Sequence, residues 1–216
     1  MKDTRVKLLQ TAARMFSKKG YNGVSVRDIV SEAKVNISSI HYHFGDKQGL
    51  YLSTIQYLIQ QTRAHLLAQV SLPEPEQISQ MSDAQLLDVL HRLFDRLLDM
   101  KFDRQHIQLE RMFTYAELES SDEMIKLLLS YVAPMSNILG KIISRLTGLK
   151  EKTPKLILLI HTIFWQLNIS EWQQFVVVHI LKKDKLDAGL RTQIKCFIWN
   201  NILHTLNQYK KGIQPA

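Results

Sequence analysis

The stretch SVRDIVSEAKVNISSIHYHF, which runs from Ser25 to Phe44, decides the fold of the N-terminal part of the chain. Ser25 and Asp28 have the spacing of a capping box, in which each side chain bonds to the backbone of the other, and they predict the start of a short helix. That helix ends near Ala33, and Asn36 is a suitable N-cap for the next one, which runs to about Phe44. Two short helices with about three residues between them have the proportions of a helix-turn-helix.

Apolar residues recur at helical spacing on both sides of this stretch, and no segment shows sustained alternation of period two. A first helix is expected from about Thr4 to Lys19, where Gly20 and Gly23 end it. A fourth helix covers about 47–70, and the two prolines of residues 71–75 indicate a linker. Further helices are expected near 83–101, 104–119, 122–147, 154–181 and 187–209, with Pro134 kinking or splitting the third of them. The predicted fold is all-α, with a three-helix N-terminal headpiece at 1–50 followed by a helical domain at 51–216.

Basic side chains outnumber acidic ones by 28 to 20 over the 216 residues, but the charge is unevenly placed. Residues 1–50 carry nine basic and four acidic side chains, whereas residues 74–123 carry five and twelve. Basic charge permits nucleic acid as a partner without establishing it, and the dense N-terminal block is the best candidate for a surface that faces anions. The single cysteine, Cys196, excludes an internal disulfide framework and an all-cysteine metal site. No apolar segment follows the first residues and no stretch of 18 apolar residues occurs, so the cytoplasm is expected and a membrane is not.

The helix predicted at 36–44 divides cleanly into two faces. Ile40 and Phe44 lie four residues apart and share an inward face, with Val35 packing at the turn. The side chains left outside are Ser38, Ser39, His41, Tyr42 and His43. Hydroxyl, imidazole and phenol groups can donate and accept hydrogen bonds at base edges and phosphates, and flat rings can contact thymine methyls. His41 and His43 are two residues apart and point in different directions, so they are not expected to form a metal site.

These residues belong to a longer pattern formed by Gly20-Tyr21, residues 25–30, 33–36 and 40–47, and Leu50-Tyr51. The pattern resembles the DNA-binding headpiece of the TetR family of transcriptional regulators over about 45 residues, and residues 36–51 are similar to the CecR-like subgroup. The remainder of the chain matches the family in length and helicity alone. The resemblance implies a DNA-binding headpiece at 1–50 and a helical effector-binding and dimerisation domain at 51–216. It also implies a homodimer that binds a palindromic operator in double-stranded DNA and is released when a small-molecule effector binds. A transcriptional activator of the same fold remains an alternative.

The resemblance also assigns roles to individual residues. Ser25 would offer the capped end of its helix to a phosphate, Ser38 and Ser39 would face the bases, and Lys47 would hold a phosphate with the amides of its helix. The family usually has glycine at the turn, where this chain has Lys34. Either the turn differs, or a cost on the order of 1 kcal/mol is accepted because the lysine adds charge near DNA. The full set of predicted DNA contacts is Ser25, Lys34, Asn36, Ser38, Ser39, His41, Tyr42, His43 and Lys47.

The C-terminal region offers weaker signals. Aromatic, methionine and histidine side chains could line an effector pocket or form plain core, and the candidates are Phe94, Phe102, His106, Met112, Tyr115 and Tyr131. The acidic charge of this region favours a neutral or cationic effector, unless it only reflects solvated helix faces. Apolar stripes on the last two long helices are candidates for a four-helix dimer interface, with the intramolecular core as the alternative. Their residues are Leu158, Thr162, Trp165, Ile194, Ile198 and Ile202.

No motif of a catalytic site is found. The sequence has no glycine-rich phosphate loop, no His-Glu-x-x-His pair and no Cys-His-Asp arrangement at a diagnostic spacing. Cys196 lies within an apolar helix, which suggests a packing role. No enzyme activity, cofactor or metal is therefore expected. The remaining competitor is a helical adaptor that binds a protein and whose headpiece no longer binds DNA.

Overall fold

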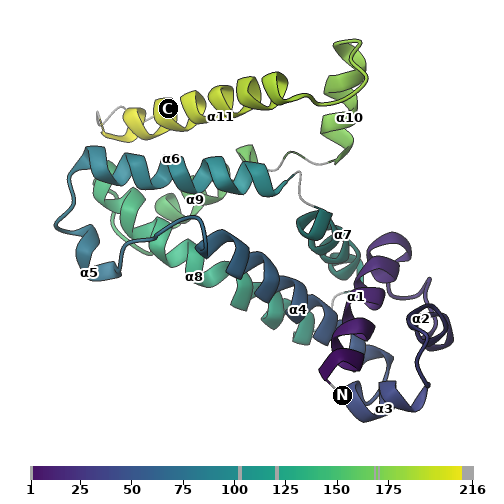
Figure 1. The fold of residues 1–216 in the computed structure, drawn as a ribbon. Coiled ribbons are helices and arrows are strands. Elements are labelled where there is room, and N and C mark those ends of the chain that lie inside the picture. Colours follow the sequence, from purple (N-terminus) through teal and green to yellow (C-terminus); the bar gives the residue numbers. More distant parts are fainter. Residues whose placement is uncertain (1, 102–103, 120–121, 168, 170, 211–216) are drawn as a thin grey trace. The chain divides into compact units, whose positions relative to one another are not determined.

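The computed structural model describes residues 2–101, 104–119, 122–167, 169 and 171–210, and the described residues form helices joined by turns. The helices are α1 (Lys2–Lys19), α2 (Val26–Ala33), α3 (Ser38–Phe44), α4 (Lys47–Leu67), α5 (Pro75–Ile78), α6 (Asp83–Met100), α7 (Arg104–Glu119), α8 (Asp122–Thr147), α9 (Pro154–Gln166), α10 (Glu171–Ile180) and α11 (Ala188–Lys210) (Figure 1). The expectation of an all-α fold is confirmed.

The chain divides into two compact units. The first unit comprises Met1–Leu66 and Phe102–Val132, and the second comprises Leu67–Lys101 and Ala133–Ala216. The boundary expected after residue 50 divides the chain by function, and it stays a prediction. The packing units are different, because α4, α7 and the start of α8 belong to the same unit as the headpiece.

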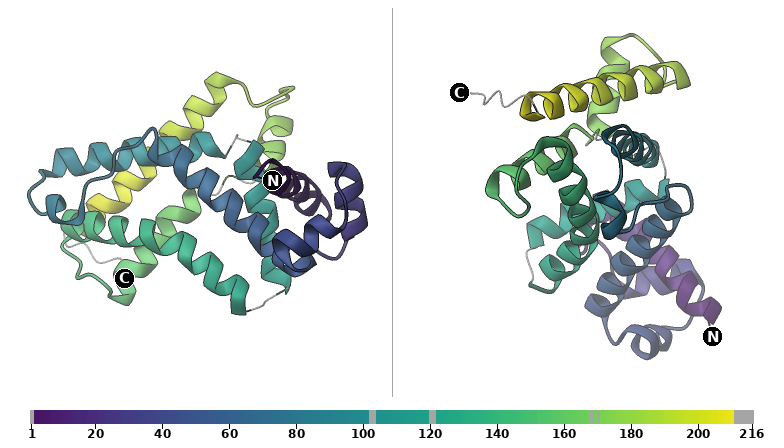
Figure 2. Two further views of the ribbon diagram at one scale, coloured as in Figure 1. Left: turned by 60° about the horizontal axis from the view of Figure 1, so that its bottom comes forward. Right: turned by 90° about the vertical axis from the view of Figure 1, so that its left-hand side faces the viewer.

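The core of the first unit begins with the apolar face of α1. Leu9, Phe16 and Ile29 are completely buried, and Ile40 of α3 joins them. Figure 2 shows α1, α2 and α3 gathered at the N-terminal end of α4. Met112 of α7 is buried in the same core. The headpiece and α7 therefore share one apolar interior.

The predicted capping box is present at the start of α2. The backbone amide of Asp28 donates to the Ser25 hydroxyl at 3.1 Å, and the Ser25 amide donates to the Asp28 carboxylate at 3.0 Å. The hydrogen bonds from the Ser25 hydroxyl and amide hold the pKa of Asp28 below its ordinary value. A cap this local depends on adjacent residues alone, which explains why the sequence predicts it.

At the turn of the helix-turn-helix, α2 ends with Lys34 in the left-handed conformation, at φ 51° and ψ 51°. Its amide donates to the carbonyl of Ser31, and the amide of Val35 donates to the carbonyl of Val30 at 3.0 Å. This pair of bonds is the Schellman motif, which requires a left-handed residue. The alternative that the turn differs from the glycine-containing form is therefore wrong.

The structure corrects three details of the predicted helices. The helix expected over 154–181 is two helices, because the amide of Ile169 bonds to the carbonyl of Leu167 in a tight turn and α10 begins only at Glu171. Of the two effects expected at Pro134, the split does not occur, because α8 continues to Thr147, and the kink stays a prediction. A short helix, α5, starts at Pro75, since proline is well suited to the first helical position.

By length and composition, one described segment, Ile125–Thr147 of α8, could span a membrane. Its C-terminal part contributes Leu139, Ile142 and Ile143 to the buried interior of the second unit. One such helix is weak evidence of a membrane span, because core helices of other proteins pass the same test.

Candidate nucleic-acid interface and effector cavity

Helix α3 presents the polar face that the sequence predicts. His41 and Tyr42 are exposed, the latter by 70%, whereas Ser39 and His43 are half-buried. Ile40 is fully buried and Phe44 packs against the core from the edge, so the inward face is also as predicted. The outward face of α3 therefore offers hydroxyl, imidazole and phenol groups side by side.

Two of the predicted contact residues also shape α3 itself. The side-chain oxygen of Asn36 accepts hydrogen bonds from the backbone amide and the hydroxyl of Ser38, both at 2.9 Å. Asn36 therefore orders the first turn of α3. The Ser38 hydroxyl donates to Asn36 and retains its lone pairs, so it would meet DNA as an acceptor.

The orientation of the His41 ring is fixed by the end of α3. His41 Nδ1 lies 2.8 Å from the carbonyl oxygen of Gly45, which can only accept, so Nδ1 is the donor. The Nε2 atom is then the one left to meet DNA. Gly45 follows at φ 80°, a conformation that favours glycine.

Lys47, at the start of α4, is held by an aromatic ring. Its ammonium lies 4.2 Å from the ring centroid of Tyr21, and Tyr21 packs against the rings of Phe16 and Tyr51. The first turn of α4 is further ordered by Asp46, whose carboxylate accepts from the amide of Gly49 at 2.7 Å. A cation above a ring face gains about 0.5–1 kcal/mol at an exposed site. The lysine predicted to clamp a phosphate therefore has a preferred position beside the helix terminus.

A second cation lies against the last residue of α3. The guanidinium of Arg5, near the start of α1, lies 5.5 Å from the ring centroid of Phe44. Arg5 is exposed and was not among the predicted DNA contacts. No local pattern could have identified it, because its position next to α3 depends on how α1 folds back over the headpiece.

The predicted effector-pocket residues divide between the two units. Met112 is fully buried in the core of the first unit, where its carbonyl accepts from the hydroxyl of Tyr51. Burial, with a smaller contribution from the charge of Glu110, raises the pKa of Tyr131 to about 12. Tyr115 packs over Gly20, at whose position a Cβ would lie 3.0 Å from the tyrosine ring. Phe102 and the side chain of His106 lie outside the described residues.

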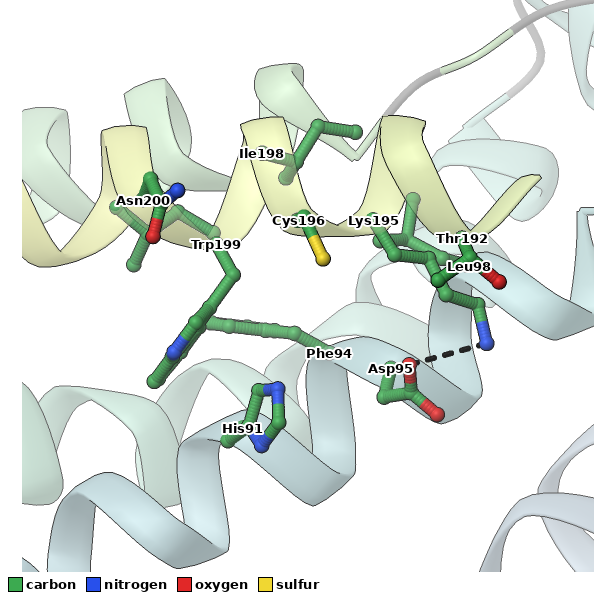
Figure 3. Close-up of a pocket in the computed structure, with 11 residues that line it drawn as sticks. His91, Phe94, Asp95, Leu98, Thr192, Lys195, Cys196, Ile198, Trp199 and Asn200 are labelled. Atoms are coloured by element: carbon green, nitrogen blue, oxygen red, sulfur yellow. Dashed lines mark ion pairs between the residues drawn. The ribbon is translucent and has the colours of Figure 1, made fainter. Parts of the chain in front are cut away.

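Phe94 is the predicted pocket residue that lines a described cavity. This cavity, of about 340 Å³, lies in the second unit between α6 and α11 (Figure 3). Sequence spacing missed its other residues, because they come from two helices about a hundred positions apart. Their assignment as an effector site remains a prediction.

The residues predicted for a dimer interface differ in exposure. Leu158, Thr162 and Trp165 of α9 are exposed, with Trp165 at 80%, whereas Ile202 of α11 is completely buried within its own chain. Burial of Ile202 is what the alternative, an intramolecular core, predicts for that position. Phe197, on the same predicted stripe of α11, is 72% exposed.

Ile194 and Ile198 are half-buried on α11, and Cys196 is exposed. The expectation that Cys196 packs inside an apolar helix is therefore wrong, because α11 buries little of its surface within the chain. Among the described residues, no three histidine, cysteine, aspartate or glutamate side chains gather where they could hold a metal ion.

Comparison with known proteins finds a family model that is similar to the headpiece. Residues 8–54 match the model described as bacterial regulatory proteins, tetR family. YttP of Bacillus subtilis (strain 168), a probable HTH-type transcriptional regulator, is 29% identical over 59% of this chain and 56% of its own. The HTH-type transcriptional repressor NicS of Pseudomonas putida is 33% identical over 34% of this chain and 35% of its own. The match thus spans little more than half of the length of YttP and about a third of that of NicS.

Solved structures extend the likeness to the whole fold. The crystal structure of AibR in complex with isovaleryl coenzyme A and operator DNA matches 92% of this chain and 97% of its own, with a TM-score of 0.65 and 14% identity. At this identity the match concerns the fold, and it confirms the predicted headpiece followed by a helical domain. Similarity to the CecR-like subgroup stays a prediction.

Proposed function

We propose that the chain is a ligand-responsive transcriptional repressor of the tetR family, whose model its residues 8–54 match. Its dimer binds a palindromic operator in the cytoplasm and is released when a small-molecule effector binds the helical domain. The observation that carries the proposal is the polar outward face of α3 together with two cations, Lys47 just after its C-terminal end and Arg5 on its last residue, each held on an aromatic ring.

In this proposal α3 enters the major groove and α2 crosses the backbone. The exposed Ser38, His41 and Tyr42 meet base edges and phosphates, while Ser39 and His43 contribute from the half-buried rim. Lys47 contacts a phosphate together with the first-turn amides of α4, where the helix dipole favours an anion. Ser25 and Lys34, which cap the two ends of α2, lie near the DNA backbone in this proposal.

The operator-binding form is a homodimer. Two headpieces reach half-sites about one helical turn of DNA apart, roughly 34 Å, only if two-fold symmetry holds them in place. The exposed apolar side chains of α9 and α11, Leu158, Trp165 and Phe197 among them, supply a surface for this contact. Large exposed apolar patches are typical of such interfaces.

A salt titration of operator binding tests the proposal. If two headpieces together neutralise about six phosphates, log K falls with log salt at a slope near −5. A flat dependence would contradict DNA binding and would favour the adaptor alternative. A reporter gene placed behind the operator distinguishes a repressor from an activator.

Two variants separate the roles of the headpiece residues. Lys47→Ala weakens binding to all sequences about equally and reduces the slope by about 1 per headpiece, because a phosphate contact carries no sequence information. Ser39→Ala changes base preference at one position of each half-site. If Lys47→Ala left the slope unchanged, the phosphate role of Lys47 would be wrong.

A further inference from the structure

The cavity between α6 and α11 lies along two antiparallel helices. Lys210 of α11 bonds to Asp83 near the start of α6, and Lys195 bonds to Asp95 and Asp99 near its end. A cavity of about 340 Å³ lies between the two helices, at the lower end of the roughly 300–1,000 Å³ usual for ligand pockets. Of the two connections, the one between Lys195 and Asp95 lines the cavity.

One part of the cavity is aromatic. The ring centroids of His91 and Trp199 lie 4.6 Å apart with their planes inclined by 41°, and Phe94 lies 6.3 Å from Trp199. Figure 3 shows Trp199 pointing from α11 toward His91 and Phe94 of α6. Phe94 is almost fully buried, whereas His91 is exposed. The rings of His91 and Trp199 are too close for a ligand to lie between them, so a flat apolar ligand would lie beside the pair.

One helical turn along, the cavity wall is charged. Lys195 Nζ lies 3.0 Å from Asp95 and 2.7 Å from Asp99, so two carboxylates share one ammonium. The Lys195 side chain is 19% exposed and that of Asp95 is 45% exposed. Partial burial lowers the pKa of Lys195, but its hydrogen bonds to Asp99 and Asp95 outweigh this and raise the pKa above the ordinary value. The group therefore carries one net negative charge.

The net negative charge of Asp95, Asp99 and Lys195 together favours a cationic ligand. Asp99 holds Lys195 at the shorter of the two distances, so Asp95 can turn one oxygen to a second cation without leaving the lysine unpaired. A carboxylate or phosphate ligand would instead meet the surplus negative charge. His91 and Asp95 are one turn apart on α6, as Lys195 and Trp199 are on α11, which sets roughly 5–6 Å between the aromatic and the ionic part.

We propose that the α6–α11 cavity binds a flat aromatic organic cation, with its rings beside Trp199 and His91 and its positive nitrogen at Asp95. That this ligand acts as an effector rests on the proposed function. Helix α11 also carries Phe197 of the surface proposed for dimerisation. A ligand between α6 and α11 would thus favour one spacing of the two headpieces over another.

Three acridines of equal ring size test the charge preference on the purified protein without DNA. At neutral pH 9-aminoacridine is a cation, acridine is neutral and acridine-9-carboxylate is an anion. Isothermal titration calorimetry is expected to give a dissociation constant for the cation about fivefold below that of acridine, with the anion weakest. Equal or tighter binding of the anion, or no binding of any acridine, would overturn the proposal.

Variants assign the binding to this cavity. Asp95→Asn removes the preference for the cation over acridine, while Asp99 continues to hold Lys195. The matched control is Asp88→Asn, the same change on an exposed carboxylate of α6 that pairs with Arg92. Trp199→Leu weakens all three ligands, by about tenfold for the cation. The proposal fails if Asp95→Asn and Asp88→Asn change the ratio of cation to acridine equally.

These outcomes are separable from the proposed function. Absence of acridine binding would overturn the cavity assignment and leave the salt dependence of operator binding as it is. A flat salt dependence would overturn DNA binding and leave the acridine ratios as they are.

Discussion

The lysine at the end of α2 gives the sharpest test of the headpiece. Lys34 is exposed and left-handed at φ 51°, where a side chain crowds the following carbonyl. For residues other than glycine this conformation costs on the order of 1 kcal/mol. The Lys34→Gly variant removes that strain and, in the same step, one positive charge from each headpiece.

Loss of the strain is expected to raise the stability of the protein, whereas loss of the charge is expected to weaken operator binding. Glycine relieves about 1 kcal/mol of strain but adds freedom to the unfolded chain, so a net gain of about 0.5 kcal/mol is expected in urea unfolding. If Lys34 contacts a phosphate, the slope of log K against log salt loses about 0.9 per headpiece, or close to 2 for a dimer. The variant is then more stable and binds its operator less tightly.

The chain contains a matched control for the strain. Lys182 has the same φ of 51°, and its turn has the same two bonds, from the Lys182 amide to the His179 carbonyl and from the Lys183 amide to the Val178 carbonyl. It lies in the second unit, apart from the headpiece. Lys182→Gly is expected to give a similar gain in stability and no change in the salt slope.

Two results would refute this reasoning. If Lys182→Gly stabilises the protein and Lys34→Gly does not, the left-handed turn of α2 is not strained. If Lys34→Gly leaves the salt slope unchanged, the lysine is not retained for a contact with DNA, and the strain at the turn has no explanation in this structure.

Three further predictions concern other parts of the molecule. Gly20→Ala destabilises the first unit by about 2 kcal/mol in urea unfolding, because φ is +69° and the new Cβ lies 3.0 Å from the Tyr115 ring; an unchanged midpoint would contradict this. Tyr21→Leu weakens operator binding about fivefold in fluorescence anisotropy by releasing Lys47, whereas Tyr21→Phe, which keeps the ring, does not. Asp83 has a lowered pKa, chiefly through its hydrogen bond from a lysine, so its contribution to stability is present above about pH 4 and is lost below it. Asp83→Asn should therefore lose less stability than the natural chain between about pH 6 and about pH 3.

Local chemistry explains what the sequence alone could predict. The capping box of Ser25 and Asp28, the turn at Lys34 and the two faces of α3 depend on residues within a few positions of each other. Hydrogen bonds and helical periodicity over such distances do not require the rest of the fold. For this reason the headpiece and its outward side chains are predictable from the sequence.

Tertiary packing decided the rest. The ring of Tyr21 beneath Lys47, the guanidinium of Arg5 beside Phe44 and the shared carboxylates of Lys195 join residues that are far apart in sequence. Helical spacing identifies which face of a helix is apolar, but it does not identify the helix that this face meets. Hence Tyr115 packs over Gly20 and Ile202 is buried within its own chain, although the same patterns also suit a pocket and a dimer interface.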